Sequence, residues 1–409
     1  MAKKTADEPI AADETSEISK NLLTAMLSEK ETRKTHFNFV KSVQSVIPSG
    51  SLKLDNYLKV KSGTVIRMGG PAEVGKTSQS LLFAANYMRT LPKSKTLYVN
   101  AEAKFGEEIQ ARTGMKFVRD GANWNYGTVF ILDTNCFDTI CDILQALYQS
   151  MAESGEHLCV ILDSVDMLTL KSSMDKKISD GKKPAGVNYL TKELFRRLCG
   201  YNTHYNGLII MITQYSATFT MSQYEKEAPN LMDGNQTHAL NHQSSYALYY
   251  QPRSPSHYIL EHDKEKPDPV KNKILGVNAK VNVKKSSTDE TGYMLEIPIR
   301  KGKVGSGIWV EKELFDALFL LDLVKKSGAW LELDPMLTQW INEENKPTVV
   351  ENEKIKEANK NKKDEDKKPL LPLLELKSKH QGLEQFSTYF ESNQPVLECI
   401  LNKIRTLYS

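Results

Sequence analysis

The sequence lacks any apolar run close to the roughly 18 residues that a membrane-spanning helix needs. Its first residues, MAKKTADEPIAADETSE, lack the apolar stretch of a signal peptide. Cysteine is scarce, and the five thiols are odd in number and widely spaced, so neither a disulfide framework nor a CxxC metal site fits. We therefore expect a cytoplasmic protein with reduced thiols and no membrane partner.

A large excess of charge of one sign is also missing, because the formal net charge is only +3. Bulk charge therefore does not hold this protein on nucleic acid, and any such binding must be local. The 409 residues are 40% hydrophobic and 26% charged, close to the globular average. That length allows one large domain or two to three ordinary ones.

The N-terminal region begins with about 18 polar residues that have no periodic apolar face, which is typical of a mobile tail. A helix is expected from Ser19 to Arg33, where Leu22, Leu23, Met26 and Leu27 form one apolar stripe. The stripe needs a partner to bury it. The pattern leaves open whether that partner is the chain's own core or a neighbouring subunit.

From Ile47 to about Tyr250, short apolar runs alternate with helical segments, which indicates an α/β fold with a mostly parallel central sheet. Each strand run reads as apolar throughout, as expected when helices cover both faces. The expected strands are Thr64–Met68, Thr96–Val99, Thr128–Leu132, Leu158–Leu162 and Leu208–Ile212, and the expected helices include Thr77–Leu91, Thr139–Met151 and Tyr189–Tyr201.

The pattern changes after Tyr250. Two alternating runs, Leu275–Val283 and Tyr293–Ile299, predict strands that extend the sheet antiparallel, and a helix is expected from Lys312 to Lys325. Residues 351–368 are mostly charged, which favours a solvated helix or linker over core. The segment Leu383–Ser409 predicts a small helical tail that docks on the rest of the protein.

The strongest signal is a phosphate-binding loop that matches GxxxxGK[ST] and lies between an expected strand and an expected helix. Backbone amides at a helix N-terminus favour an anion, so we expect ATP there, with Lys76 reaching its β and γ phosphates and Thr77 binding Mg²⁺. The alternative is a chance glycine-rich turn. The expected ATP-binding residues of the loop are Gly70, Pro71, Ala72, Glu73, Val74, Gly75, Lys76, Thr77 and Ser78.

Two carboxylates follow other expected strands of the same sheet. Asp163 ends the run Leu158–Leu162 and is expected to reach the metal through water, although it could also cap the following turn. Glu102 follows the run Thr96–Val99 and is a candidate general base for the water that attacks the γ phosphate. The carboxyl edge of such a sheet is where ligands bind.

The order of these segments resembles the RecA-type strand-exchange recombinase family, in particular its bacteriophage relatives. The resemblance covers about residues 47–333 and rests on Ser49–Asp55, the loop at Gly70, Asn100-Ala101-Glu102, Leu162-Asp163-Ser164, Met211–Gln214, Val281–Lys285 and Gly328-Ala329-Trp330. It implies a RecA-like ATPase core in which Gln214 senses the γ phosphate.

The resemblance implies a DNA-dependent ATPase that forms helical filaments on single-stranded DNA. Such a protein would pair that DNA with homologous duplex and exchange strands, in a bacterial or phage-infected cell, with possible single-strand-binding or mediator proteins as partners. The expected division is a tail with an oligomerisation helix at 1–46, the core at 47–333, a charged linker at 334–368 and a C-terminal helical segment at 369–409, which we expect to be regulatory or partner-docking.

The resemblance also places two DNA-binding loops, at about 170–187 and 215–243. The first is a flexible cationic stretch, although an ordinary solvated loop has a similar composition. The second mixes apolar groups and amides that could wedge between bases. The candidate DNA-binding residues are Lys171, Lys176, Lys177, Lys182 and Lys183 in the first loop and Phe219, Met221, Tyr224, Gly234, Asn235 and Gln236 in the second.

Two further residues are assigned to ATP through the resemblance: His242 would relay nucleotide state across a subunit boundary, and Lys285 would reach the neighbour's phosphates. The spacing of His238 and His242 could suit a metal pair, but no third ligand accompanies them. The chain departs from the family pattern at Asn100, Ile109 and Ser287.

Two other functions share these motifs. One is a structural filament that uses ATP only for assembly and protects DNA without strand exchange, which the three departures favour. The other is a hexameric RecA-fold helicase, against which stand the matches at Ser49–Asp55 and Gly328–Trp330.

Overall fold

The computed structural model describes residues 15–29, 36–38, 40–106, 114–174, 187–217, 231–233, 242–262, 266–288, 290–301, 307–360 and 367–408. The chain divides into two compact units, Met1–Val43 and Gln44–Ser409. The first contains helix α1, Thr15–Ser28, which starts four residues before the expected helix. Leu22, Leu23 and Met26 of its apolar stripe are all more than half exposed.

The second unit is built on a central sheet that has eleven strands among the described residues. The strand order is β11-β10-β8-β1-β6-β5-β2-β4-β3, with β7 on β6 and β9 on β10. The strands are β1 Thr64–Gly70, β2 Ser94–Asn100, β3 Lys116–Val118, β4 Thr128–Leu132, β5 His157–Asp163, β6 Leu208–Ala217, β7 Leu231–Asp233, β8 Tyr246–Tyr250, β9 Tyr258–Leu260, β10 Ile274–Lys285 and β11 Met294–Arg300.

The centre of the sheet is parallel: β1 pairs with β6 and β8, β5 with β6 and β2, and β4 with β2 and β3. Strand β10 runs antiparallel to β8, β9 and β11, which confirms the predicted antiparallel extension. The expectation that each strand run is apolar throughout is wrong at several positions, of which Arg67 is the charged one. Arg67 of β1 is only 2% exposed, and its guanidinium donates to the hydroxyl of Tyr249 (3.0 Å).

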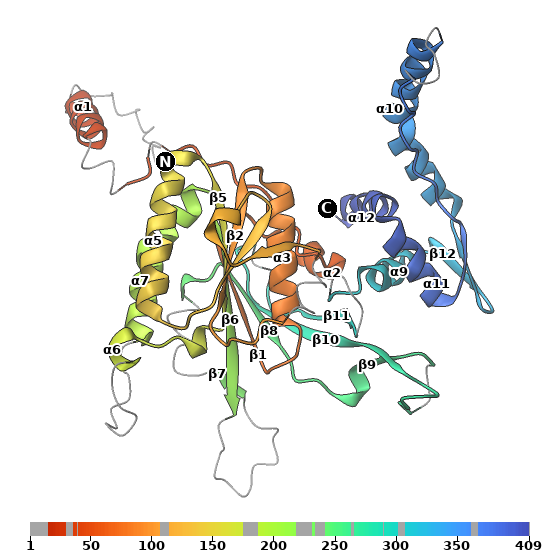
Figure 1. Ribbon diagram of the computed structural model, residues 1–409, viewed down its shortest axis with the longest axis horizontal. Helices are drawn as coiled ribbons and strands as arrows, with labels where there is room; N and C mark the ends of the chain where they lie inside the picture. The colour runs from red at the N-terminus through yellow and green to blue at the C-terminus, as the bar shows by residue number, and fades with distance from the viewer. Residues whose placement is uncertain are drawn as a thin grey trace, which may run out of the picture. The chain divides into compact units, whose positions relative to one another are not determined.

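Helices cover both faces of this sheet (Figure 1). Helix α3, Lys76–Thr90, packs on one face, where Phe83 and Tyr87 join a core with Tyr98 and Ile161. Helices α5, Phe137–Ser154, and α7, Val187–His204, pack on the other face with Val160. Successive strand residues face opposite sides of a sheet, so β5 contributes Ile161 to one core and Val160 to the other.

Short helical segments connect these elements. They are α2 Leu52–Tyr57, α6 Lys171–Met174 and three 3₁₀ turns at Gly121–Asn123, Val165–Met167 and Pro255–His257. No helix in the described ranges is long and apolar enough to cross a bilayer.

The C-terminal part of this unit has a third core around helix α9, Val310–Leu320. The predicted helix Lys312–Lys325 is wrong at its end, because Asp322 adopts a left-handed φ of 57° and the Leu323 amide bonds back to Leu318. That geometry closes a helix. Strand β12, Val324–Ser327, then pairs with β13, Trp330–Leu333, and β13 pairs with β14, Lys379–Gln381.

The last two helices, α11 Gly382–Ser392 and α12 Gln394–Tyr408, also belong to this third core. Phe386, Phe390, Ile400 and Ile404 are fully buried in it, which confirms that the tail docks on the protein. The expected boundaries within 44–409 stay predictions.

Residues of the expected charged linker form helix α10, Pro335–Asn359, followed by an extended segment at 367–378 that runs back along it. The returning segment runs beside α10 in Figure 1, and three asparagines seven residues apart bond the two together. Each side-chain amide donates to a backbone carbonyl and accepts from the amide of the same returning residue: Asn345 bonds Leu374, Asn352 bonds Leu371 and Asn359 bonds Lys368. We call residues 335–374 the arm.

Two buried carboxylates join the C-terminal core to helix α2, which precedes the first strand of the central sheet. Glu313 of α9, which is fully buried, accepts hydrogen bonds from the Ser51 hydroxyl (2.7 Å) and the Leu52 amide (2.6 Å). Asp55 of α2 forms an ion pair with Arg405 of α12 (3.1 Å). These contacts cap and fix the short helix α2.

Candidate nucleotide-binding site

The expected phosphate-binding loop lies between the end of β1 at Gly70 and the start of α3 at Lys76, the strand and helix that the sequence predicts around it. Gly75 caps α3 with a left-handed φ of 98°, and an added Cβ would overlap the Ile299 side chain. At Gly70 an added Cβ would lie 2.7 Å from the carbonyl oxygen of Tyr250. Gly70 therefore requires glycine for space, because the overlap is with backbone, whereas Gly75 requires it for its left-handed backbone conformation, because the end of the Ile299 side chain can move.

Lys76 is folded back onto its own loop. Its Nζ donates to the carbonyl oxygens of Gly70 (2.8 Å) and Pro71 (2.5 Å), and the residue is 6% exposed. Burial lowers the pKa of Lys76 to about 8, although the carboxylates of Asp163 and Glu102 oppose that change. A phosphate oxygen is charged, so it would be a stronger partner for this ammonium than the two carbonyl oxygens and could take their place.

Asp163 and Thr77 form the candidate metal site. The Thr77 hydroxyl donates to Asp163 Oδ2 (2.8 Å), and the Tyr98 hydroxyl donates to the same oxygen (2.6 Å). Burial raises the pKa of Asp163, while the bonds from Tyr98 and Thr77 act in the opposite direction. A hydroxyl and a carboxylate are the oxygen donors that Mg²⁺ prefers, so these residues fit that ion.

Glu102 lies in the same cavity as Asp163 and contacts Gln214 and Lys104 there. Glu102 Oε1 accepts a hydrogen bond from the Gln214 side-chain amide (2.5 Å), and Oε2 lies 3.3 Å from Lys104 Nζ. Burial raises the pKa of Glu102, but hydrogen bonds from Lys104, Gln214 and other neighbours together with the Lys104 charge outweigh it and leave that pKa below its usual value. Glu102 is therefore ionised at neutral pH, as a general base must be.

Gln214 also connects this site to the two expected DNA-binding loops. Its backbone amide donates to Asp166 Oδ2 (2.5 Å), just after the end of β5. Beyond Gln214, strand β6 continues past the sheet and pairs antiparallel with β7, with Tyr215 opposite Asp233 (Figure 1). The second expected loop therefore begins as a β-hairpin.

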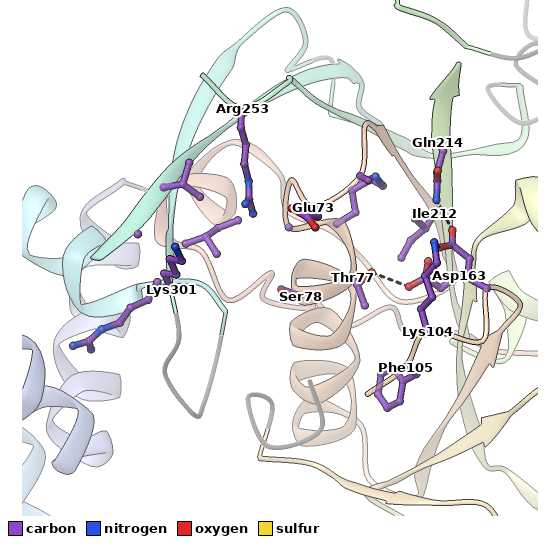
Figure 2. Close-up of a pocket in the computed structure, with 18 of the residues that line it drawn as sticks. Glu73, Thr77, Ser78, Lys104, Phe105, Asp163, Ile212, Gln214, Arg253 and Lys301 are labelled. Atoms are coloured by element: carbon purple, nitrogen blue, oxygen red, sulfur yellow. Dashed lines mark hydrogen bonds and ion pairs between the residues drawn. The ribbon is translucent and has the colours of Figure 1, made fainter. Parts of the chain in front are cut away.

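A cavity of about 690 Å³ contains these groups between two walls. Figure 2 shows Asp163, Gln214 and Lys104 on one side and Arg253 and Lys301 on the other, with the phosphate-binding loop between them. Sequence reasoning missed four residues of this region: Tyr98, Lys104, Asp166 and Arg253. A lysine two residues after the candidate base was the one signal that the sequence did offer.

Other predicted site residues lie elsewhere. Lys285 Nζ donates to the carbonyl oxygen of His242 (3.3 Å), and neither residue is among the described residues that line this cavity. Lys171 begins α6, where its amide donates to Asp138 (2.8 Å). Outside the described residues lie Ile109, Lys176, Lys177, Lys182, Lys183, Phe219, Met221, Tyr224, Gly234, Asn235, Gln236 and His238.

Two departures from the family pattern have defined contacts. The Asn100 side-chain amide donates to Asp133 Oδ1 (2.6 Å), and the Ser287 hydroxyl donates to the hydroxyl of Tyr246 (2.6 Å). Both residues are therefore held by bonds within the subunit.

The fold is α/β, and the cavity lies at the carboxyl edge of the sheet, where ligands of such folds bind, next to the loop that the sequence predicts to bind phosphate. No protein-family model matches the chain. It is 26% identical over 337 residues to Protein RecA of Porphyromonas gingivalis, covering 78% of this chain and 86% of the relative. It is also 26% identical over 316 residues to Protein RecA of Bacillus mycoides, covering 76% and 82%.

A third relative, Protein RecA of Bacillus pumilus, is 24% identical over 296 residues, covering 70% of this chain and 73% of the relative. These similarities support the RecA-type recombinase family for this chain, as the sequence motifs indicate. The relatives named here are bacterial, so they give no support to the expected phage-infected cell.

Proposed function

We propose that this protein is an ATP-dependent recombinase that forms filaments on single-stranded DNA and catalyses homologous pairing and strand exchange. One observation carries the proposal: Lys76, Thr77, Asp163, Glu102 and Gln214 come from four separate segments and line one cavity. The bacterial RecA relatives add support from an independent direction.

In the proposed hydrolysis, a water oxygen attacks the γ phosphorus and gives its proton to Glu102. The bond from phosphorus to the β–γ bridging oxygen breaks, and ADP leaves with that electron pair. Lys76 stabilises the charge on the transferred phosphoryl group, and Gln214 positions the water or the γ phosphate. Thr77 and Asp163 would hold Mg²⁺, which neutralises phosphate charge when bound.

DNA is proposed to lie along the two loops that start beside this cavity. The chain from Asp166 leads to Lys171, and the chain from Gln214 leads into the β6–β7 hairpin. Gln214 contacts Glu102 through its side chain and Asp166 through its backbone. We therefore propose that Gln214 links the nucleotide site to the two DNA-binding loops. The filament would be completed by α1 and by His242 and Lys285 at a subunit boundary, with mediator proteins as further partners.

The decisive experiment compares ATP hydrolysis with and without single-stranded DNA for the wild type, Glu102→Gln and the surface control Glu353→Gln. We expect strong DNA stimulation in the wild type and in the control. Glu102→Gln should lose at least about 100-fold in rate, the lower end of the usual contribution of a general base. DNA-independent turnover that is equal in all three proteins would contradict the proposal.

A nucleotide-dependent DNA filament without strand exchange is the second candidate. The contacts of Glu102 favour this candidate. Both carboxylate oxygens already have partners, which leaves neither oxygen free to take the proton of an attacking water, as in a filament that binds ATP only for assembly. The two functions differ in a joint-molecule assay with homologous single-stranded and duplex DNA. Filaments without joint molecules would select the second candidate, and unwinding by a closed ring would instead select a helicase.

A further inference from the structure

The turn after strand β2 brings a second lysine into the nucleotide cavity. Ala103 has a left-handed φ of 54°, and its amide bonds back to the carbonyl of Asn100 (3.4 Å). A residue with a Cβ rarely takes this conformation. The reversal places the side chain of Lys104 against that of Glu102, on the cavity wall that also carries Asp163 (Figure 2).

Lys104 and Glu102 differ sharply in exposure. The lysine side chain is 79% exposed, whereas that of Glu102 is 13% exposed. An ion pair at 3.3 Å with one exposed partner contributes little free energy and is readily exchanged. The four-carbon stem of lysine also lets its ammonium move while the backbone stays in place.

A nucleoside triphosphate would change the balance of charges around this lysine. Its terminal phosphate is a stronger partner for an ammonium than a carboxylate that already accepts a bond from Gln214. Lys76 approaches from the loop at the start of α3, whereas Lys104 approaches from the end of β2. The two lysines could therefore contact different oxygens of the terminal phosphate.

We propose that Lys104 is a second phosphate-binding lysine, which stays paired with Glu102 until a nucleoside triphosphate binds. Its ammonium then moves to the terminal phosphate, and Glu102 Oε2 becomes free to accept the proton of the attacking water. The inference rests on the proposed ATPase function, but it assigns to this chain's own subunit a positive charge beyond Lys76. ADP lacks the terminal phosphate and leaves Lys104 on Glu102.

The binding test uses the full chain with ATP and with ADP, each competing against a fluorescent nucleotide, in the absence of DNA. The variants are Lys104→Met, which keeps the length and removes the charge, Lys104→Arg, which keeps the charge, and Lys116→Met as an exposed control outside the cavity. We expect Lys104→Met to weaken ATP binding by about 10- to 100-fold, the range for a lost hydrogen bond to a charged group.

The same variant should bind ADP within about twofold of the wild type, because it loses only a terminal-phosphate contact. Lys104→Arg should restore the preference for ATP, and Lys116→Met should retain it. Equal ATP-to-ADP affinity ratios in the wild type and Lys104→Met would overturn the proposal.

The pH dependence of kcat distinguishes phosphate binding by Lys104 from an effect of Lys104 on the pKa of Glu102 alone. If Lys104 only lowers the pKa of Glu102, Lys104→Met should move the acidic limb to higher pH and leave the affinity ratio unchanged, which would overturn the proposal. The binding readout needs neither turnover nor DNA. A preference for ATP that depends on Lys104 would therefore stand even if DNA failed to stimulate hydrolysis.

Discussion

Replacement of Glu313 by glutamine should change how the stability of the protein depends on pH. Glu313 is fully buried at the junction between α9 and α2. Burial raises its pKa from the usual 4.5 to about 7, against the hydrogen bonds from Ser51 and Leu52 and the charge of Lys53. The folded protein therefore binds the Glu313 proton more tightly than the unfolded chain does.

The sign of the effect follows from this difference. The stabilisation is fully present below about pH 4.5 and is lost as the pH rises through about 7, because the buried carboxyl must then ionise. The two pKa values correspond to about 3 kcal/mol of unfolding free energy. A glutamine side chain does not ionise, so Glu313→Gln should gain about 3 kcal/mol relative to the wild type between pH 4 and pH 8.

Urea unfolding followed by tryptophan fluorescence measures this difference, because Trp309 and Trp340 are buried close to the C-terminal core. Taking the difference between the two proteins at each pH cancels the titration of every other group. Glu332→Gln, on the exposed side of β13, is the matched control and should give a flat difference. A flat difference for Glu313→Gln as well would refute the reasoning.

Three other outcomes are expected. ATP affinity should fall as the pH rises through about 8, because Lys76 then loses the proton that attracts phosphate, and Lys76→Arg should remove this dependence in a binding titration. Asn352→Ala should weaken the arm by about 1–3 kcal/mol through two lost hydrogen bonds, seen as faster hydrogen exchange at the Leu371 amide. Arg405→Ala should lower stability by about 3 kcal/mol in thermal unfolding, because buried Asp55 loses its cation; a Tm close to that of the wild type would contradict this.

The phosphate-binding loop and its flanking strand and helix could be predicted because their chemistry depends on consecutive residues. The positions of Asp163 and Glu102 could be predicted as well, since each follows a recognisable apolar strand and parallel strands end at one edge. The family resemblance supplied Gln214. These predictions needed only local sequence and the order of segments.

Other features depend on contacts that the sequence does not encode locally. Lys104 faces Glu102 only because Ala103 takes a left-handed conformation, which is unusual for alanine. Arg67 lies in a run expected to be apolar throughout, yet it is a charged residue buried beside Tyr249, a partner 182 residues away. The spacing of the three arm asparagines is visible in the sequence, but their backbone partners are not.

The asparagine spacing has a consequence for the length of the arm. Seven residues of α-helix advance about 10.5 Å. Three residues of extended chain advance about 10 Å. The two advances nearly match, so every seventh residue of the helix meets every third residue of the returning segment, at Leu374, Leu371 and Lys368. An arm of another length keeps this pairing only if it differs by ten residues, seven in the helix and three in the returning segment. An insertion in only one of the two segments would move the remaining asparagines out of register with their backbone partners.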